Sequence, residues 1–148
     1  MRVSSRQTCI AILLPPTIAL FLLIPDMALS RTWHIQADGS ADAATIQAGI
    51  DSATTGDTVL VHAGTYLEAL AIVGKDIIIR SSDGPDLTTL DASGLGVPAI
   101  AFSGDVSRLA RLEGFRITGG SIGVLVINSQ PSIIGNTVSE NGPAQNGA

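Results

Sequence analysis

The chain has 148 residues, with 8 basic and 13 acidic side chains, a formal net charge of −5 and 3% aromatic residues. The acidic balance provides no basic face for nucleic acid or anionic lipid, so neither is an expected partner. This length gives one domain's worth of core at most, and the shortage of aromatic side chains means that small and β-branched residues must fill that core. Such a composition suits a narrow, layered interior better than a broad one.

Residues 1–30 have the pattern of a secretory signal peptide. Two arginines precede an apolar stretch from Cys9 to Ile24, which is shorter than the roughly 18 to 20 residues of a membrane span and contains two adjacent prolines. Small residues at the two positions that a signal peptidase reads predict cleavage between Ser30 and Arg31. We therefore expect a secreted protein, extracellular or periplasmic, with residues 31–148 as its mature domain; an uncleaved membrane anchor is the alternative. Because Cys9 is the only cysteine, we expect no disulfide in that domain.

One segment after the signal predicts a helix. In the sequence DAATIQAGIDSATTG, Asp42 can act as the N-cap and Gly56 can stop the helix. Ile46 and Ile50 lie one turn apart and give the segment an apolar side. We expect this helix over residues 43–53.

The rest of the chain predicts short strands, because apolar or alternating runs of about four residues recur and each ends at Gly, Asn, Asp or Ser. These runs form two interleaved series with steps of roughly twenty residues. The first series is TVLV from 58, IIIR from 77, IAFS from 100 and LVIN from 125. The second series is ALAI from 69, TTLD from 88, FRIT from 115 and NTVS from 136.

A repeat of this length that carries two strands is typical of one turn of a parallel solenoid. Each turn has an apolar inner side that is too small to be stable alone, and stacked turns bury it in a continuous column. The predicted fold is therefore all-β, a parallel β-helix of about four turns whose first turn is capped by the amphipathic helix. Ile79, Phe102 and Ile117 are expected to point into the core. A two-sheet sandwich is the alternative, and Asn-Gly hairpin turns between the strands would favour it.

The run TIQAGIDSATTGDTVLVHAGTYLEALAIVGKDIIIRSSDG contains several short motifs in a fixed order. The motif residues are Thr45–Ala48, Gly56–Val59, Gly64–Tyr66, Glu68 and Gly74–Lys75. This order resembles the opening of right-handed parallel β-helix proteins of the pectate-lyase-like superfamily, and the resemblance extends over residues 33–142. It implies a right-handed coil. It does not imply one activity, because lyases, hydrolases, esterases, epimerases and non-catalytic surface proteins share these motifs.

His34 and His62 are the only histidines, and they lie in different segments. Without a cysteine partner in residues 31–148, their spacing predicts no metal site. His62 follows the TVLV strand at a corner, where a catalytic base would need an orienting carboxylate and a nucleophile. We favour the interpretation of His62 as a solvated turn residue.

Three aspartates, Asp83, Asp86 and Asp91, lie close together in SSDGPDLTTLD. Such a cluster could bind calcium or form an acid pair. Tight corners select the same residues, because Asp before Gly and Asp after Pro are typical of turns. Turn chemistry is the interpretation that we favour.

Three arginines, Arg108, Arg111 and Arg116, lie in DVSRLARLEGFRIT. Any of them could bind a uronate carboxylate through two parallel hydrogen bonds. However, Arg111 and Glu113 flank Leu112 on one side of a predicted strand, so a surface ion pair is the commoner outcome.

The sequence therefore assigns no catalytic, cofactor-binding or metal-binding residue. The catalytic motifs of polygalacturonases, pectate lyases and pectin esterases are absent. The leading hypothesis is a secreted β-helix protein, or an N-terminal fragment of one, that contacts polysaccharide or a cell-surface partner. The alternative is the N-terminal part of a polysaccharide lyase, glycoside hydrolase or carbohydrate esterase with its active site beyond residue 148. We also expect the domain to be truncated at its C-terminal end and to self-associate there, because the residues after NTVS offer no apolar cap.

Overall fold

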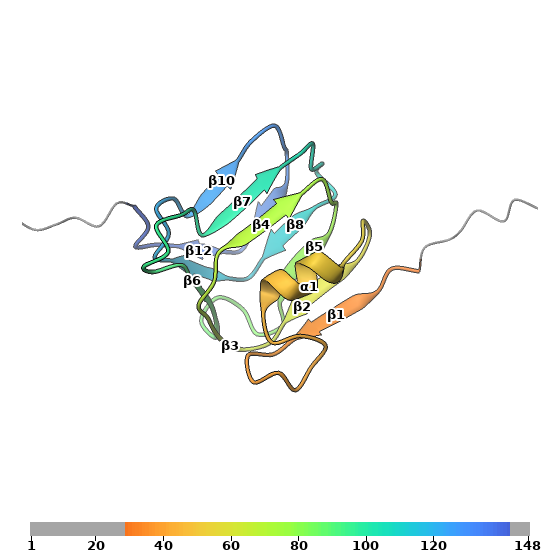
Figure 1. Ribbon diagram of the computed structural model, residues 1–148, viewed down its shortest axis with the longest axis horizontal. Helices are drawn as coiled ribbons and strands as arrows, with labels where there is room; N and C mark the ends of the chain where they lie inside the picture. Colours follow the sequence, from red (N-terminus) through yellow and green to blue (C-terminus); the bar gives the residue numbers. More distant parts are fainter. Residues whose placement is uncertain (1–28, 143–148) are drawn as a thin grey trace, which may run out of the picture.

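The computed structural model describes residues 29–142, so almost all of the predicted signal segment lies outside the described residues. Within this range, twelve strands and one helix, α1 (Ile46–Ser52), follow one another along the chain. All pairings between these strands are parallel. The stacked sheets make a β-solenoid of about four turns (Figure 1). The predicted fold class is confirmed, and the parallel pairing excludes the two-sheet sandwich with hairpin turns.

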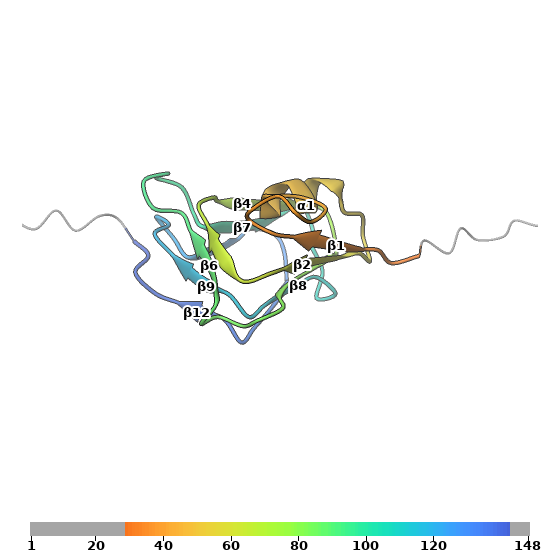
Figure 2. The same ribbon diagram turned by 90° about the horizontal axis from the view of Figure 1, so that it is seen from below.

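The strands form three sheets, which enclose the core on three sides (Figure 2). Sheet A contains, in spatial order, β1 (Thr32–Ile35), β2 (Thr58–Val61), β5 (Ile78–Ser81), β8 (Arg111–Glu113) and β11 (Ser132–Ile134). Sheet B contains β3 (Gly64–Tyr66), β6 (Thr88–Asp91), β9 (Arg116–Thr118) and β12 (Thr137–Val138). Sheet C contains β4 (Leu70–Val73), β7 (Ile100–Ser103) and β10 (Val124–Val126). A complete turn therefore contributes one strand to each sheet.

The prediction of two strands per turn is wrong. The runs TVLV and IIIR belong to sheet A, but IAFS and LVIN, which were expected to stack on them, form β7 and β10 of sheet C. Likewise ALAI forms β4 of sheet C, whereas TTLD, FRIT and NTVS lie in sheet B. A search for apolar runs overlooks the third strand of a turn because β3 reads GTY and β8 reads RLE. Each of the three sheets receives one strand per turn, so the spacing of strands along the chain does not show which sheet a given strand belongs to.

Side chains that face inward stack into columns across neighbouring turns. In sheet A, Val59 lies opposite Ile79 and Ile79 lies opposite Leu112, and none of the three is exposed. Phe102 in sheet C and Ile117 in sheet B are buried in the same way. The predicted inward orientation of Ile79, Phe102 and Ile117 is confirmed. Continuous burial of this kind is the main stabilising term for a solenoid, because one turn alone buries too little apolar surface.

Helix α1 closes the N-terminal end of the solenoid beside β4 (Figure 1). Gln47 satisfies the edge of β4, because its Oε1 accepts from the Ala71 N–H at 2.9 Å and its Nε2 donates to the Ala71 carbonyl at 3.3 Å. Ile46 and Ile50 are buried beneath the helix, as predicted. The helix therefore replaces the strand that a preceding turn would supply. No helix within residues 29–142 has the length and apolar character needed to cross a membrane.

The predicted N-cap of this helix is wrong. The N-cap is Thr45, whose hydroxyl accepts from the Ala48 N–H at 3.3 Å. Asp42 instead accepts from the backbone N–H of His34 at 2.8 Å and is held beside β1. As a result, the helix spans Ile46–Ser52 rather than 43–53.

The residues that carry the family resemblance hold this cap in place. The two carboxylate oxygens of Glu68 accept from the N–H groups of the first two helical residues, at 2.8 and 2.9 Å. Lys75 Nζ donates to two carbonyls near the end of the helix, each at 3.0 Å. The hydroxyl of Tyr66 donates to the His62 carbonyl at 2.9 Å and braces the corner between β2 and β3. These motif residues therefore have structural roles.

At the opposite end, the core columns are open within the described residues. Side chains of the last turn that continue the columns are 41–49% exposed, whereas their partners one turn earlier are at most 1% exposed. The exposed and buried partners are Val126 on Phe102, Ile133 on Leu112, and Val138 on Ile117.

Candidate functional site

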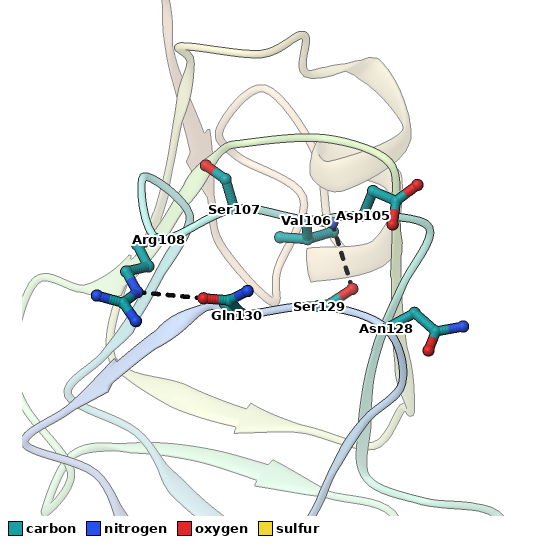
Figure 3. A pocket seen from close by; sticks show the side chains of 7 residues that line it. All are labelled: Asp105, Val106, Ser107, Arg108, Asn128, Ser129 and Gln130. Carbon is teal, nitrogen blue, oxygen red and sulfur yellow. Dashed lines mark hydrogen bonds between the residues drawn. The ribbon is translucent and has the colours of Figure 1, made fainter.

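Two corners of successive turns form a polar groove on the surface of the solenoid (Figure 3). The first corner lies between β7 and β8, and the second lies between β10 and β11. The hollow has a volume of about 430 Å³, near the lower end of the roughly 300–1,000 Å³ that small-molecule sites enclose. Six of its seven lining residues have polar side chains, but their carbon atoms make up most of the surface that faces the hollow; the residues are Asp105, Val106, Ser107, Arg108, Asn128, Ser129 and Gln130. We call this hollow the corner groove.

The backbone of the corner groove is held by hydrogen bonds between the two corners. The Gln130 N–H donates to the Val106 carbonyl at 2.8 Å, and the Val106 N–H donates to Ser129 Oγ at 3.2 Å. The preceding turn also holds Ser107, since the Asp76 carboxylate accepts from its N–H at 2.7 Å and from its hydroxyl at 2.6 Å. A site that is ordered in this way before a ligand arrives loses less entropy on binding.

The two ends of the groove differ in charge. Figure 3 shows Arg108 beside Gln130 at one end, with Asp105 and Asn128 at the other. Arg108 Nε donates to Gln130 Oε1 at 3.3 Å, which orients the guanidinium and leaves its other N–H groups for a ligand. Asp105 and Asn128 have φ angles of 62° and 46°, in the left-handed region that these residue types tolerate at tight corners. One end therefore offers cationic donors, and the other offers a carboxylate and an amide.

Of the three candidate arginines, only Arg108 lines the corner groove. Arg111 Nη1 lies 3.2 Å from Glu113 Oε1, which confirms the predicted surface ion pair. Arg116 lies on β9 of another sheet, and its Nη2 is 3.7 Å from Asp86 Oδ1. Within residues 29–142, no carboxylate lies within ion-pair distance of Arg108, so its charge is available to a ligand.

The three candidate aspartates have separate contacts. Asp83 Oδ2 accepts from the Ser82 hydroxyl at 2.6 Å and from a backbone N–H of the neighbouring corner at 3.1 Å. Asp91 Oδ1 accepts from the Ser93 N–H at 2.9 Å, as in an Asx turn. The side chain of Asp86 is 92% exposed. In the described part of the chain, no three His, Cys, Asp or Glu side chains are grouped so that they could hold a metal ion.

The two histidines lie together, although their sequence spacing did not predict it. His34 Nδ1 and His62 Nε2 are 3.2 Å apart, and the ring centroids are 5.5 Å apart. Parallel pairing places His34 opposite Leu60, and alternation along the strand puts His62 on the same outer face of sheet A. His62 lies at the predicted corner, but it is not an isolated turn residue. Alignment of the TWHI segment with the TVLV segment is the signal that would have revealed this pair.

Asp57 is a buried acidic residue whose carboxylate accepts hydrogen bonds that stabilise the local structure. It is 6% exposed, and its carboxylate accepts from the Thr54 N–H at 2.9 Å and from the Arg31 N–H at 2.8 Å. These hydrogen bonds, that of Thr54 first, hold the pKa of Asp57 below its usual range. Trp33 Nε1 also donates to the carboxylate, at 3.4 Å. Asp57 therefore joins the start of β1 to the corner that precedes β2.

A comparison of the chain with models of protein families finds no matching family, and a comparison with curated proteins finds no matching relative.

Proposed function

We propose that the protein is an exported β-solenoid that binds polysaccharide through the corner groove. The observation that carries this proposal is the groove itself, a hydrogen-bonded hollow across two turns that is lined by polar side chains and by their carbon atoms, with unlike charges at its two ends. Sugars present hydroxyl groups that both donate and accept hydrogen bonds, and their C–H groups can contact carbon atoms, so they suit a lining that mixes polar groups with carbon surface. Export is supported by the signal pattern of residues 1–30. A polysaccharide at the cell surface or in its surroundings is the corresponding partner.

Arg108 favours an acidic sugar at its end of the groove. A guanidinium can bind a uronate carboxylate through two parallel hydrogen bonds. The carboxylate of Asp105 at the other end would repel a second acidic group and accept from hydroxyls instead. A net charge of −5 opposes a dense polyanion, but charges more than about 8 Å away are largely screened at physiological salt. We therefore propose a polysaccharide in which uronate residues alternate with neutral sugars.

We further propose that the chain is related to the right-handed parallel β-helix proteins of the pectate-lyase-like superfamily. The support is the order of its motifs and the role that Gln47, Glu68 and Lys75 have in holding the cap. Because these residues serve the cap, they argue for a fold and not for a reaction. We propose binding without catalysis, because a catalytic function would require reactive groups in addition to the residues described above. A carbohydrate-active enzyme of that superfamily is the alternative, which rests on the resemblance.

Calorimetric titration with uronate oligosaccharides and with neutral oligosaccharides tests the proposed function. We expect the uronate series to bind, and we expect Arg108→Ala to weaken binding about 10- to 100-fold, because a hydrogen bond to a charged group contributes about 1.5–3 kcal/mol. Arg116→Ala is the matched control, since it removes the same charge from an exposed position outside the groove. Equal weakening by the two variants would place the binding site elsewhere. No binding of any glycan would refute the proposal.

A further inference from the structure

The histidine pair on sheet A has the geometry of a hydrogen bond between two imidazole rings. His34 Nδ1 faces His62 Nε2 at 3.2 Å, and the ring planes differ by 16°. In such a contact, one nitrogen donates its proton and the other presents a lone pair. His34 lies on β1 and His62 directly follows the last residue of β2, and both rings are accessible to solvent. Ions from solution can therefore reach both nitrogens.

The neighbours of His62 determine which of its nitrogens carries the lone pair. Two groups near the Ser82 hydroxyl can only accept a hydrogen bond, Asp83 Oδ2 at 2.6 Å and the Val61 carbonyl oxygen at 3.2 Å, so the single hydroxyl proton is donated to one of these oxygens. Ser82 Oγ then accepts from His62 Nδ1, which is 3.3 Å away. With its proton on Nδ1, the neutral ring directs the lone pair of Nε2 towards His34. Asp83 and the Val61 carbonyl thus act through Ser82 to orient His62, as carboxylates and backbone carbonyls do behind metal-binding histidines.

We propose that His34 and His62 form a binding site for a late first-row divalent cation, Cu²⁺ first and Zn²⁺ or Ni²⁺ next. With metal–nitrogen distances of about 2.0–2.1 Å, two ligand nitrogens lie about 3.4 Å apart in the tetrahedral site of Zn²⁺ and about 2.8 Å apart in the square-planar site that Cu²⁺ prefers. The observed separation of 3.2 Å lies between these two values, so the rings need only turn until both lone pairs converge on one ion. The cation displaces the proton shared by the two nitrogens, and His34 then carries its proton on Nε2. Imidazole nitrogen is a preferred ligand of these metals, and Cu²⁺ binds most tightly among them.

The proposed site is open, with two protein ligands. In the described residues, no third His, Cys, Asp or Glu side chain completes it, so water or an oxygen of a bound molecule fills the other positions. Affinity is therefore lower than in closed sites with three or four protein ligands. The site lies on β1 and at the end of β2, on earlier turns than the corner groove. The inference does not depend on the proposed function.

Titration of the full chain with CuCl₂ and with ZnCl₂, followed by calorimetry, tests this inference. All titrations use a Cys9→Ser background, because Cys9 is the only thiol and the two histidines are the only imidazoles in the sequence. We expect one ion per chain, tighter binding of Cu²⁺ than of Zn²⁺, and two nitrogen ligands in the electron paramagnetic resonance spectrum of the copper complex. His34→Gln and His62→Gln should each weaken binding more than about tenfold, and Ser82→Ala should weaken it about tenfold through loss of orientation.

Glu113→Gln is the matched control, because it removes a carboxylate from β8 of the same sheet and leaves both imidazoles in place. Its affinity for Cu²⁺ should equal that of the parent, and far-UV circular dichroism of every variant should match the parent spectrum. Two independent ions per chain, a single nitrogen ligand, or unchanged affinity in His62→Gln would overturn the proposal. An absence of binding by either metal would also overturn it.

Discussion

Replacement of Asp57 by asparagine tests the junction between β1 and the first corner. Asp57 is 6% exposed, and four donors reach its carboxylate: the Thr54 N–H at 2.9 Å, the Thr54 hydroxyl at 3.1 Å, the Arg31 N–H at 2.8 Å and Trp33 Nε1 at 3.4 Å. Asparagine has the same size, but it replaces one acceptor oxygen by an NH₂ group that faces other donors. A hydrogen bond to a charged group contributes about 1.5–3 kcal/mol, and a buried donor without a partner costs about 1–3 kcal/mol. We therefore expect the free energy of unfolding to fall by about 3 kcal/mol.

The destabilisation by Asp57→Asn should become smaller as the pH falls. Hydrogen bonds from Thr54, and then from Arg31, lower the pKa of Asp57 in the folded protein. A carboxyl group of this kind stabilises the fold fully above its unfolded pKa of about 3.9, and it loses that contribution as the pH falls through the lower folded pKa. The difference in unfolding free energy between the parent and Asp57→Asn is therefore largest near neutral pH and shrinks below about pH 4.

Urea unfolding at a series of pH values, followed by circular dichroism, measures both effects. Asp86→Asn is the control, because that side chain is 92% exposed, and its unfolding free energy should lie within about 0.5 kcal/mol of the parent value. Two results would show that the Asp57 carboxylate does not stabilise the fold. One is an unfolding free energy of Asp57→Asn equal to that of Asp86→Asn, and the other is a difference between the parent and Asp57→Asn that does not become smaller below about pH 4.

Two further substitutions test the core and the cap. Phe102 is 1% exposed in the sheet C column, so Phe102→Ala should lower the unfolding free energy by about 3–5 kcal/mol through the cavity that it leaves. If calorimetry gives Phe102→Ala the same melting temperature as the parent, Phe102 does not pack in the core. Glu68→Ala removes the acceptors of the first two N–H groups of α1 and should cost about 1–2 kcal/mol. Amide hydrogen exchange should accelerate in α1 before it does in β5 and β8, and uniform acceleration would show that the cap is not a separate unit.

The stacking of turns could be predicted from the sequence, because four-residue apolar runs such as those of β2 and β7 recur at steps of roughly twenty residues. The number of strands per turn could not. Each of the three-residue strands β3 and β8 buries a single side chain, Tyr66 and Leu112 respectively, so neither shows a period. Which sheet a strand joins depends on the direction of the chain at each corner, and that direction comes from backbone conformations that residue types do not specify uniquely.

The histidine pair and the N-cap were missed for a different reason, because both depend on the register of β1 against β2. Its pairing with β2 brings His34 to His62, which lie 28 positions apart in the chain. The same strand holds Asp42, because the Asp42 N–H donates to the His34 carbonyl at 2.9 Å while the Asp42 carboxylate accepts from the His34 N–H. Aspartate and threonine are both good N-caps, so Thr45 takes that role once Asp42 is held by β1. Local sequence rules do not include such long-range competition.

The open end of the solenoid leads to the last prediction, which concerns association between copies of the protein. Within residues 29–142, no strand pairs with the outer edges of β10, β11 and β12. Val126, Ile133 and Val138 continue the core columns there and are 41%, 42% and 49% exposed. Unpaired edges beside apolar side chains are a template for pairing with another chain. Two copies that meet through the same surface can do so around a two-fold axis, which buries both ends at once.

We therefore predict that the protein produced as residues 31–148 self-associates through this end, with a sedimentation coefficient above that of a monomer at concentrations on the order of tens of micromolar. The double variant Ile133→Lys, Val138→Lys should sediment as a monomer, because charged side chains at an exposed strand edge oppose pairing. Leu67→Lys is the control: Leu67 is 77% exposed and lies between β3 and β4 near the capped end, so this variant should associate like the parent. A monomeric parent, or equal loss of association in Leu67→Lys, would mean that the open columns do not drive the contact. Association of the double variant as strong as that of the parent would locate the contact on another surface, because the lysines lie on the apolar columns that the predicted contact must bury.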